Sequence, residues 1–421
     1  MNAKTLLKNY GLLICMVVAI VAGCIVGAVW PGATALEPLG TVFMNLMYCI
    51  VVPLVFSSIA STVANTRSRK RSGKILGVTI GSFVVTGVFA CIIMIVIVNI
   101  IPPVTSAWSN MESVTVAEQQ SITEMLVNLL TTDDFVGLLS RRAILPLIVF
   151  SILLGFGVNM SGGADSIVGK WLENLSEAMM KIMTIITYYA PIAFFGFFAN
   201  LVATYGAQIT SDYARGLAIY YPLSVIYLFT AFPLWAGYGG GKGAVKIMFS
   251  HIFRPAVTAL ATCSSVANIP TNLTSCKETG VPDDVAEMVI PLGATMHMDG
   301  NCFSGILKIA FLCGVFGIPF TGFGLYVKAI IVCVLSAVGA SGIPGGGYIS
   351  EYIICAVFFP DSIELAFPIA ITIGNLVDPA STMINSVGDY VISFVVTRFM
   401  DGKDWMQKKI AADKAAQRIH A

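Results

Sequence analysis

The sequence predicts an all-α polytopic membrane protein with eight transmembrane helices and two re-entrant helical hairpins. The 421 residues have a mean hydropathy of +0.84, and only 11% of them are charged, against about a quarter in a soluble protein. Apolar runs of about 20 residues, the length that crosses about 30 Å of hydrocarbon, recur along the chain. In the second half these runs are broken by Gly, Pro, Ser and Asn, which a lipid-facing helix does not tolerate.

Six spans are clear from the apolar runs, at residues 10–30, 40–64, 75–101, 143–160, 175–204 and 214–237. The first is long enough to span and lacks a small-residue cleavage pattern, so we expect a helix there and not a signal peptide. The ten cysteines are scattered singly, which predicts buried apolar residues and no disulfide or zinc site. A net charge of +1 gives no indication of nucleic-acid binding.

The distribution of charge predicts the orientation in the cell membrane. The loop 66–74, TRSRKRSGK, has five basic residues and no acid, whereas residues 102–140 have five acids and no base. The positive-inside rule then places both termini and the 66–74 loop in the cytoplasm, with 102–140 outside. The basic tail 401–421 is expected to be a solvated or membrane-surface helix.

Four stretches between residues 255 and 390 contain the breaks. They are TALATCSSVANIPTN (258–272), PLGATMHMDGN (291–301), SAVGASGIPGGG (336–347) and GNLVDPASTMINSVGD (374–389). The first and third resemble hairpin tips with arms too short to span, and the other two resemble full-length helices unwound in the middle. This repeated order of hairpin and broken helix predicts a substrate and ion site near the membrane midplane.

The residues in the breaks suit such a site. Unwound carbonyls and carboxylates form oxygen cages for a cation such as Na⁺, and helix N-termini offer N–H donors to an anionic group. Asp299 and Asp389 are predicted to be functional, because an unpaired acid inside a membrane costs about 3 kcal/mol or more. A structural pair of Asp299 with Lys308 is the alternative, but nine residues separate them and place them on opposite helix faces.

Several segments together resemble the dicarboxylate/amino acid:cation symporter family, the glutamate transporter homologues. VVPLVFSSIAS (51–61) resembles its second helix, LPLIVFSILLGFGV (145–158) its fourth, and EAMMKIMTIITYYAPIAFFG (177–196) its fifth. TCSSVANIP and GASGIPGGG resemble its hairpin tips, PLGATMHMDGN its NMDGT helix and DPASTMINSVGD its last helix. The likeness covers nearly the whole chain.

The resemblance implies a homotrimer in which a mobile transport domain moves against a fixed scaffold, as in an elevator. The expected divisions are 1–66 for scaffold helices one and two, 67–102 for transport-domain helix three, 103–206 for an extracellular excursion and scaffold helices four and five, 207–400 for the transport-domain core, and 401–421 for the cytoplasmic tail. Na⁺ is the expected coupling ion, and H⁺ is possible.

The resemblance also implies ligands for Na⁺ and substrate. The residues expected at Na⁺ are Gly293, Thr295, His297, Asp299, Ala337, Val338, Ala340, Asn385 and Asp389. Asp378 corresponds to the acid that binds the substrate's amino group. The full set expected to contact substrate is Ser264, Ser265, Asn301, Ile343, Gly345, Gly347, Asp378, Ser381, Thr382 and Asn385.

Three departures from the family pattern bear on the substrate. Ser381 stands where members that carry acidic substrates have an arginine, and a serine supplies no charge-assisted fork. Cys263 stands where other members have a compensating arginine, and Asn301 replaces the threonine of NMDGT. The expected substrate is therefore a small neutral amino acid, with serine or threonine ahead of alanine and cysteine, as in the serine/threonine symporter branch. The alternative is an acidic amino acid or C4-dicarboxylate, with Lys308 supplying the positive charge.

His297 replaces the asparagine of NMDGT and leaves the third sodium site of the family open, with Ser82 and Thr86 as candidate hydroxyls. His297 either couples a proton or makes one buried hydrogen bond. No ATP or dinucleotide motif is present, so transport driven by an ion gradient is expected and enzyme activity is not. An intramembrane aspartyl protease and a passive channel are the alternatives from other classes. Proteolysis would need no Na⁺, and a channel would not accumulate its solute.

Overall fold

The computed structural model describes residues 3–64, 70–105, 107–108, 127, 131–140, 143–206, 208–339 and 347–409. These residues form helices and connecting turns, and the described part of the chain contains no strand, which confirms the all-α prediction. The helices of the first half are α1 (Ala3–Val29), α2 (Glu37–Ala64), α3 (Lys70–Ile100), α5 (Phe135–Leu138), α6 (Ile144–Met160), α7 (Ile167–Tyr205) and α8 (Gln208–Gly240), with short 3₁₀ turns at Pro31–Leu36 and Gly163–Asp165.

The helices of the second half are α9 (Ala244–His251), α10 (Phe253–Thr262), α11 (Ile269–Thr279), α12 (Asp283–Met296), α13 (Asp299–Val315), α14 (Phe323–Gly339), α15 (Tyr348–Phe358) and α16 (Ile363–Asp401), with a 3₁₀ turn at Pro360–Ser362. Six stretches of the described chain are long and apolar enough to cross a membrane, among them α2, α3, α7, α8 and α16. The sixth joins α12 to α13. The chain is thus a multi-pass membrane protein.

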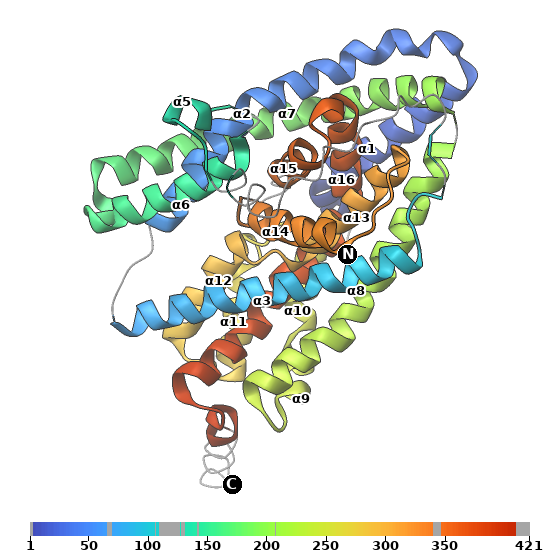
Figure 1. Cartoon of the computed structure of the whole chain (residues 1–421). Coiled ribbons are helices and arrows are strands. Elements are labelled where there is room, and N and C mark those ends of the chain that lie inside the picture. Colours follow the sequence, from blue (N-terminus) through green and yellow to red (C-terminus); the bar gives the residue numbers. More distant parts are fainter. Residues whose placement is uncertain are drawn as a thin grey trace.

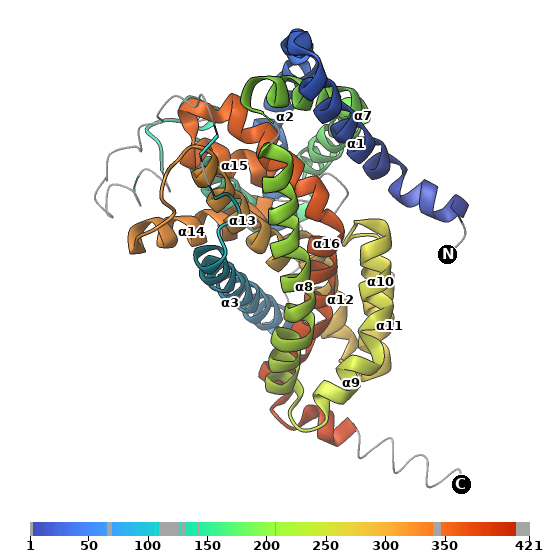
Figure 2. The same ribbon diagram turned by 90° about the vertical axis from the view of Figure 1, so that its right-hand side faces the viewer.

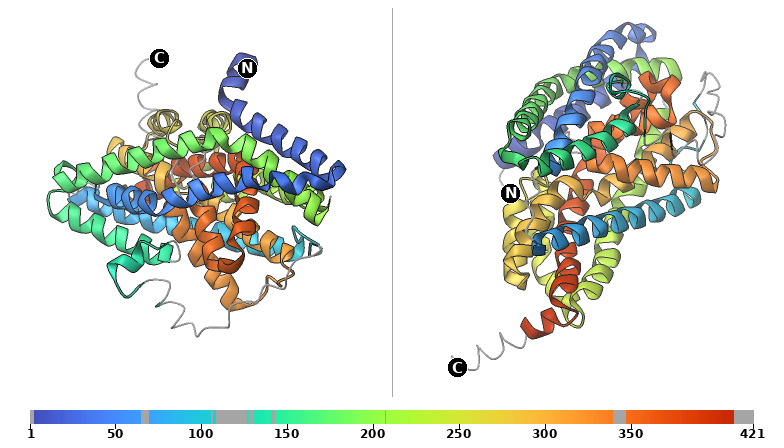
Figure 3. Two further views of the ribbon diagram at one scale, coloured as in Figure 1. Left: turned by 90° about the horizontal axis from the view of Figure 1, so that it is seen from above. Right: turned by 60° about the vertical axis from the view of Figure 1, so that its left-hand side comes forward.

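Helices α1, α2, α6 and α7 pack against one another and lie at one end of the molecule (Figures 1 and 3). Small residues allow α1 to approach α7 closely. A β-carbon on Gly23 would lie 2.5 Å from the Phe195 carbonyl oxygen, and one on Gly27 would overlap the Ala199 carbonyl oxygen. Without a hydrophobic driving force between helices in lipid, such close backbone contact is a main source of packing energy.

Replacing Gly27 by valine is therefore expected to destabilise the protein by about 1–3 kcal/mol, because the added side chain must separate α1 from α7. The matched control is Gly157→Val in α6, where an added β-carbon meets no atom within 4 Å. Thermal unfolding of the two purified variants in detergent measures the difference. Equal midpoints for the two would show that the α1–α7 approach contributes nothing to stability.

The second half is organised around α16, which packs against α3, α8, α10, α12, α13 and α15. Figure 2 shows α8 running beside α16. The pair α10 and α11 and the pair α14 and α15 correspond to the arms of the two predicted hairpins. Arms α10, α11 and α15, of 10, 11 and 11 residues, are short for a full crossing, and α14 has 17 residues. The tip of the second hairpin, residues 340–346, lies outside the described ranges. Each hairpin is followed by a longer element, α12–α13 or α16, in the order that the sequence predicted, although only the first of these elements is broken.

The two long elements differ from the prediction in one respect. The helix of residues 283–315 is broken at His297 and Met298, both non-helical, as expected. The expected break in 374–389 is wrong, because α16 continues through Pro379 without interruption. Proline removes one backbone donor and strains the preceding turn. The carbonyl that loses its helical donor is that of Asn375, and beside it the Tyr221 hydroxyl donates to the Leu376 carbonyl at 2.8 Å. Polar groups of a neighbouring helix let a membrane helix tolerate a proline.

Several predictions fall on residues outside the described ranges. They include the centre of the 66–74 loop, most of the 102–140 segment and the tail from residue 410. The orientation in the membrane and the division into scaffold and transport domains stay predictions.

Candidate functional site

One pocket brings together most of the residues predicted to bind substrate. It lies where α13, α15 and α16 meet the tip of the first hairpin. Its lining comprises Ser265, Met298, Asn301, Ser304, Lys308, Gly347, Tyr348, Glu351, Gly374, Asn375, Val377, Asp378, Ser381, Thr382 and Asn385. Of the other predicted residues, Ile343 and Gly345 lie outside the described ranges. Ser264 is buried at the hairpin tip, where its hydroxyl accepts from the Ala267 N–H at 3.2 Å.

The break between α12 and α13 is fastened to α16 by amide side chains. Asn385 Oδ1 accepts a hydrogen bond from the Gly300 N–H at 2.7 Å, which satisfies one of the free donors at the start of α13. Asn301 Oδ1 accepts from the Ser381 hydroxyl at 2.9 Å and from Asn385 Nδ2 at 3.2 Å. Ser381, Asn301 and Asn385 therefore form one polar wall of the pocket.

The first hairpin is fastened to the same helix. Asn268 Nδ2 donates to the Ser386 hydroxyl at 2.6 Å, and Asn272 Nδ2 donates to the Ser386 carbonyl at 2.7 Å. The hairpin turns at Cys263, whose φ of 49° is in the left-handed region. These contacts place the Ser265 side of the tip against the pocket, with the Cys263 thiol at the turn.

Asp378 lies on the face of α16 that lines the pocket. Its Oδ1 accepts a hydrogen bond from the Thr382 hydroxyl, one turn along the helix, at 3.2 Å. Among the described residues no arginine lines the pocket, and the only basic side chain in its lining is Lys308.

Lys308 and Glu351 form a buried ion pair on the pocket wall, with Nζ 2.5 Å from Oε1 and both side chains 3% exposed. Lys308 Nζ also donates to the Ser304 hydroxyl at 3.1 Å. The alternative pairing of Lys308 with Asp299 is therefore wrong. Glu351 was missed in the sequence, although a signal was present: one acid in the apolar helix YISEYIICAVF and one base in α13 each need a buried partner.

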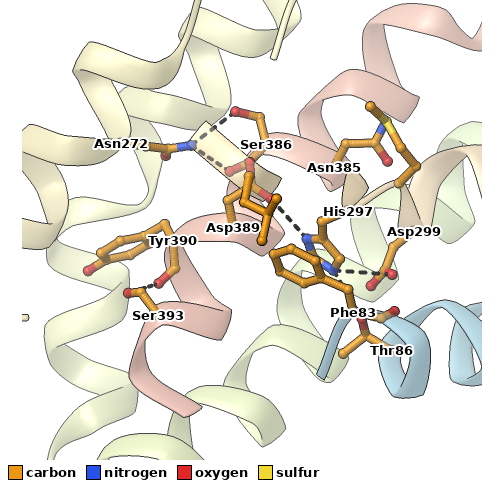
Figure 4. Close-up of polar contacts among 12 residues, drawn as sticks. Phe83, Thr86, Asn272, His297, Asp299, Asn385, Ser386, Asp389, Tyr390 and Ser393 are labelled. Atoms are coloured by element: carbon orange, nitrogen blue, oxygen red, sulfur yellow. Dashed lines mark hydrogen bonds and ion pairs between the residues drawn. The ribbon is translucent and has the colours of Figure 1, made fainter. Parts of the chain in front are cut away.

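A second polar cluster centres on His297, at the break (Figure 4). Its Nδ1 lies 3.0 Å from Asp389 Oδ1, and its Nε2 lies 3.3 Å from Asp299 Oδ1. The Thr86 hydroxyl of α3 is 3.0 Å from Nε2, and the Phe83 ring stacks on the imidazole with centroids 4.4 Å apart. Two carboxylates from α13 and α16 thus face the two nitrogens of one buried ring.

Glycines make room for this cluster. A β-carbon on Gly388 would lie 2.5 Å from His297 Cε1, and one on Gly293 would overlap the Asp389 carboxylate. Asp299 is held from another side as well, because the Tyr227 hydroxyl of α8 donates to its Oδ2 at 2.9 Å. Tyr227 was also missed, since nothing in its local sequence distinguishes it from the other aromatic residues of α8.

The structure brings together only part of the predicted Na⁺ ligand set. Gly293, His297, Asp299 and Asp389 meet at the imidazole cluster, with Asn385 at the adjoining polar wall. Of the two candidate hydroxyls on α3, Thr86 reaches the cluster, whereas Ser82 donates to the Val78 carbonyl of its own helix. Of the other expected ligands, Ala337 of α14 lines a second pocket together with Asp299 and Phe83 of the cluster. The Thr295 hydroxyl donates to the Leu292 carbonyl, Val338 belongs to α14, and Ala340 lies outside the described residues.

A family model described as "Sodium:dicarboxylate symporter family" matches residues 12–399 of the chain. A C4-dicarboxylate transport protein of Rhizobium leguminosarum is 27% identical over 404 residues, which cover 93% of this chain and 89% of that protein. Proteins of the same name from Agrobacterium fabrum and Laribacter hongkongensis are 26% and 25% identical, covering 91% and 96% of this chain and 87% and 91% of their own.

The names of these relatives differ from the branch that the sequence pattern favoured. They are named for C4-dicarboxylates, whereas Ser381, Cys263 and Asn301 indicated a neutral amino acid. The comparisons support the alternative substrate class better than the leading one. They agree with the sequence on the class of protein, a membrane symporter. From its match over residues 12–399, the chain belongs to the sodium:dicarboxylate symporter family.

Proposed function

We propose that this symporter imports a C4-dicarboxylate or an acidic amino acid together with Na⁺ or H⁺. The observation that carries the proposal is the buried ammonium of Lys308 in the lining of the pocket, where it contacts the Glu351 carboxylate and the Ser304 hydroxyl. A lysine at a buried site is a point charge that can bind a carboxylate. The relatives named C4-dicarboxylate transport proteins, which align over nine-tenths of the chain, support the same class of substrate.

Cation coupling is part of the proposal. Asp389 and Asp299 supply buried carboxylates next to the substrate pocket, and the Asp389 Oδ2 atom has no hydrogen-bond partner among the described residues. A monovalent cation at these oxygens would offset the charge of an incoming anion. The alternating-access motion is proposed to be an elevator movement of the domain built around α16, in a homotrimer.

The second candidate substrate is a small neutral amino acid such as serine or threonine. Asp378 favours it, because a carboxylate facing the pocket suits an ammonium group and repels a dianion. The pairing of Lys308 with Glu351 points the same way, since it leaves the lysine's charge already neutralised. An acidic amino acid would use both Asp378 and Lys308.

The test is uptake of radiolabelled fumarate, aspartate and serine into proteoliposomes that contain the purified chain. A Na⁺ gradient, a proton gradient or neither is imposed across the membrane. We expect gradient-driven uptake of fumarate or aspartate that excess unlabelled serine does not block. Serine uptake that threonine blocks and fumarate does not would overturn this proposal in favour of the second candidate.

The variant Asp378→Asn further distinguishes transport of an amino acid from transport of a dicarboxylate. We expect this variant to raise the KM of any amino acid about 100-fold, because the ammonium group loses its buried counter-charge. The KM of fumarate should stay the same or fall, because a like charge has been removed from the pocket. The matched control is Asp361→Asn, on an exposed 3₁₀ turn. A fumarate KM that rises as steeply as that of aspartate would contradict the assignment of Asp378 to an amino group.

A further inference from the structure

The Lys308–Glu351 pair is an unusual feature of the pocket wall, because ion pairs buried this deeply are expensive to form. Taking two charges out of water is repaid only by excellent geometry and by satisfied hydrogen bonds. Here Glu351 Oε1 contacts Nζ at 2.5 Å, but Glu351 Oε2 has no hydrogen-bond partner among the described residues. Lys308 has three donors, of which the structure assigns two, to Glu351 and Ser304. Glu351 therefore has one oxygen, and Lys308 one N–H donor, to which the structure assigns no partner among the described residues.

A glycine on α16, which packs against both α13 and α15, makes space for the pair. A β-carbon on Gly374 of α16 would overlap Glu351 Oε1 and would come within 3.4 Å of Lys308 Nζ. Gly374 also lies one helical turn before Asp378 and lines the same pocket. The pair is thus at the pocket surface, along α16 from the Asp378 position, and an elongated substrate could extend along the pocket wall between them.

The charges in the lining limit what can bind there. Lys308 from α13, Glu351 from α15 and Asp378 from α16 sum to one negative charge. The other titratable groups near Glu351 are Tyr348 and Cys355 of α15, both uncharged at neutral pH. A dianion bound to this lining meets two carboxylates and one ammonium that is already paired. A proton on Glu351 removes one of those carboxylates and frees the ammonium.

We propose that the Lys308–Glu351 pair is the subsite for the second carboxylate of the substrate. The incoming carboxylate replaces Glu351 as the partner of Lys308 Nζ, and Glu351 takes up a proton from the side on which the substrate enters. Substrate and proton then leave together on the other side, and the pair forms again. This inference rests on the proposed function, because a neutral amino acid has no second carboxylate.

The test uses the full chain in proteoliposomes, with fumarate as the probe because it stays a dianion over the range of pH used. Lys308→Met should raise the KM of fumarate about 100-fold through loss of the buried counter-charge. Glu351→Gln should keep fumarate uptake but lose the rise in KM that the wild type shows as the pH increases. A pH-sensitive dye inside the vesicles should record proton entry with fumarate for the wild type and less for Glu351→Gln.

Two further variants test whether the effect is specific to Lys308 and whether it results from misfolding. Lys328→Met is the matched control, because Lys328 of α14 is partly buried and donates to the Val357 carbonyl away from the pocket; its fumarate KM should match the wild type. The double variant Lys308→Met/Glu351→Gln removes both charges of the pair, so neither is left buried without its partner. It should therefore fold and still lose fumarate uptake.

The outcomes separate the two claims. Fumarate uptake by the wild type that Lys308→Met leaves unchanged would overturn the subsite and leave the proposed function standing. Fumarate uptake by Glu351→Gln with the wild-type pH dependence would overturn the proton step. A wild type that takes up serine and no fumarate would overturn the proposed function and the inference with it.

Discussion

Replacing Asp389 by asparagine is expected to lower cation-coupled uptake about 100- to 1,000-fold. Asp389 is fully buried, and its Oδ1 lies 3.0 Å from His297 Nδ1. A hydrogen bond to a charged group contributes about 1.5–3 kcal/mol, the loss of a carboxylate ligand of the cation adds to this, and each 1.4 kcal/mol is about a factor of ten. The substitution preserves shape, so the loss would report the charge, which is also the charge proposed to bind the coupling cation.

Uptake alone does not distinguish a lost cation site from a misfolded protein, so thermal unfolding with and without Na⁺ is the second measurement. Wild-type protein should be stabilised by Na⁺ through mass action, and the Asp389→Asn variant should not. Asp361→Asn, at an exposed position, should behave like the wild type in both measurements. A variant that keeps Na⁺ stabilisation and transports within tenfold of the wild type would exclude Asp389 from cation binding.

Much of the fold was predictable because membrane spans obey a simple length rule. The six clear runs correspond to α1, α2, α3, α6, α7 and α8, and the two hairpins were indicated by arms too short to span. The break at His297 was also predicted. The break predicted from the composition of residues 374–389 was wrong, because a proline and several polar residues indicate a break only when no neighbouring helix supplies hydrogen bonds. Those partners, such as Tyr221 on α8, lie far away in the sequence.

The site was predictable where a single segment supplies its residues, and less so where distant helices meet. Asp378, Ser381 and Asn385 share one face of α16, so one motif indicated all three. Glu351 and Tyr227 act through partners 43 and 72 residues away, and their contacts depend on how the helices pack. The substrate illustrates the same limit: the sequence indicated Lys308 as the positive charge for an acidic substrate, but only the packing of α13 against α15 showed that Glu351 already pairs with it.

Gly388→Ala is expected to lower uptake about 100-fold through a clash with a single ring. The new β-carbon would lie 2.5 Å from His297 Cε1, closer than atoms in contact can approach. The ring has little freedom to retreat, because it is held by Thr86, stacked on Phe83 and flanked by two carboxylates. Moving it breaks at least one contact to a buried charge, which costs about 3 kcal/mol.

Alanine is the better helix former by about 1 kcal/mol, so a loss of function cannot be attributed to helix propensity. The control is Gly81→Ala in α3, where an added β-carbon meets no atom within 4 Å; its uptake should equal that of the wild type. The double variant Gly388→Ala/His297→Ala should recover thermal stability, because the clash is removed, but not uptake, because the imidazole is lost. Wild-type uptake by Gly388→Ala would show that transport does not require His297 to stay between Asp299 and Asp389.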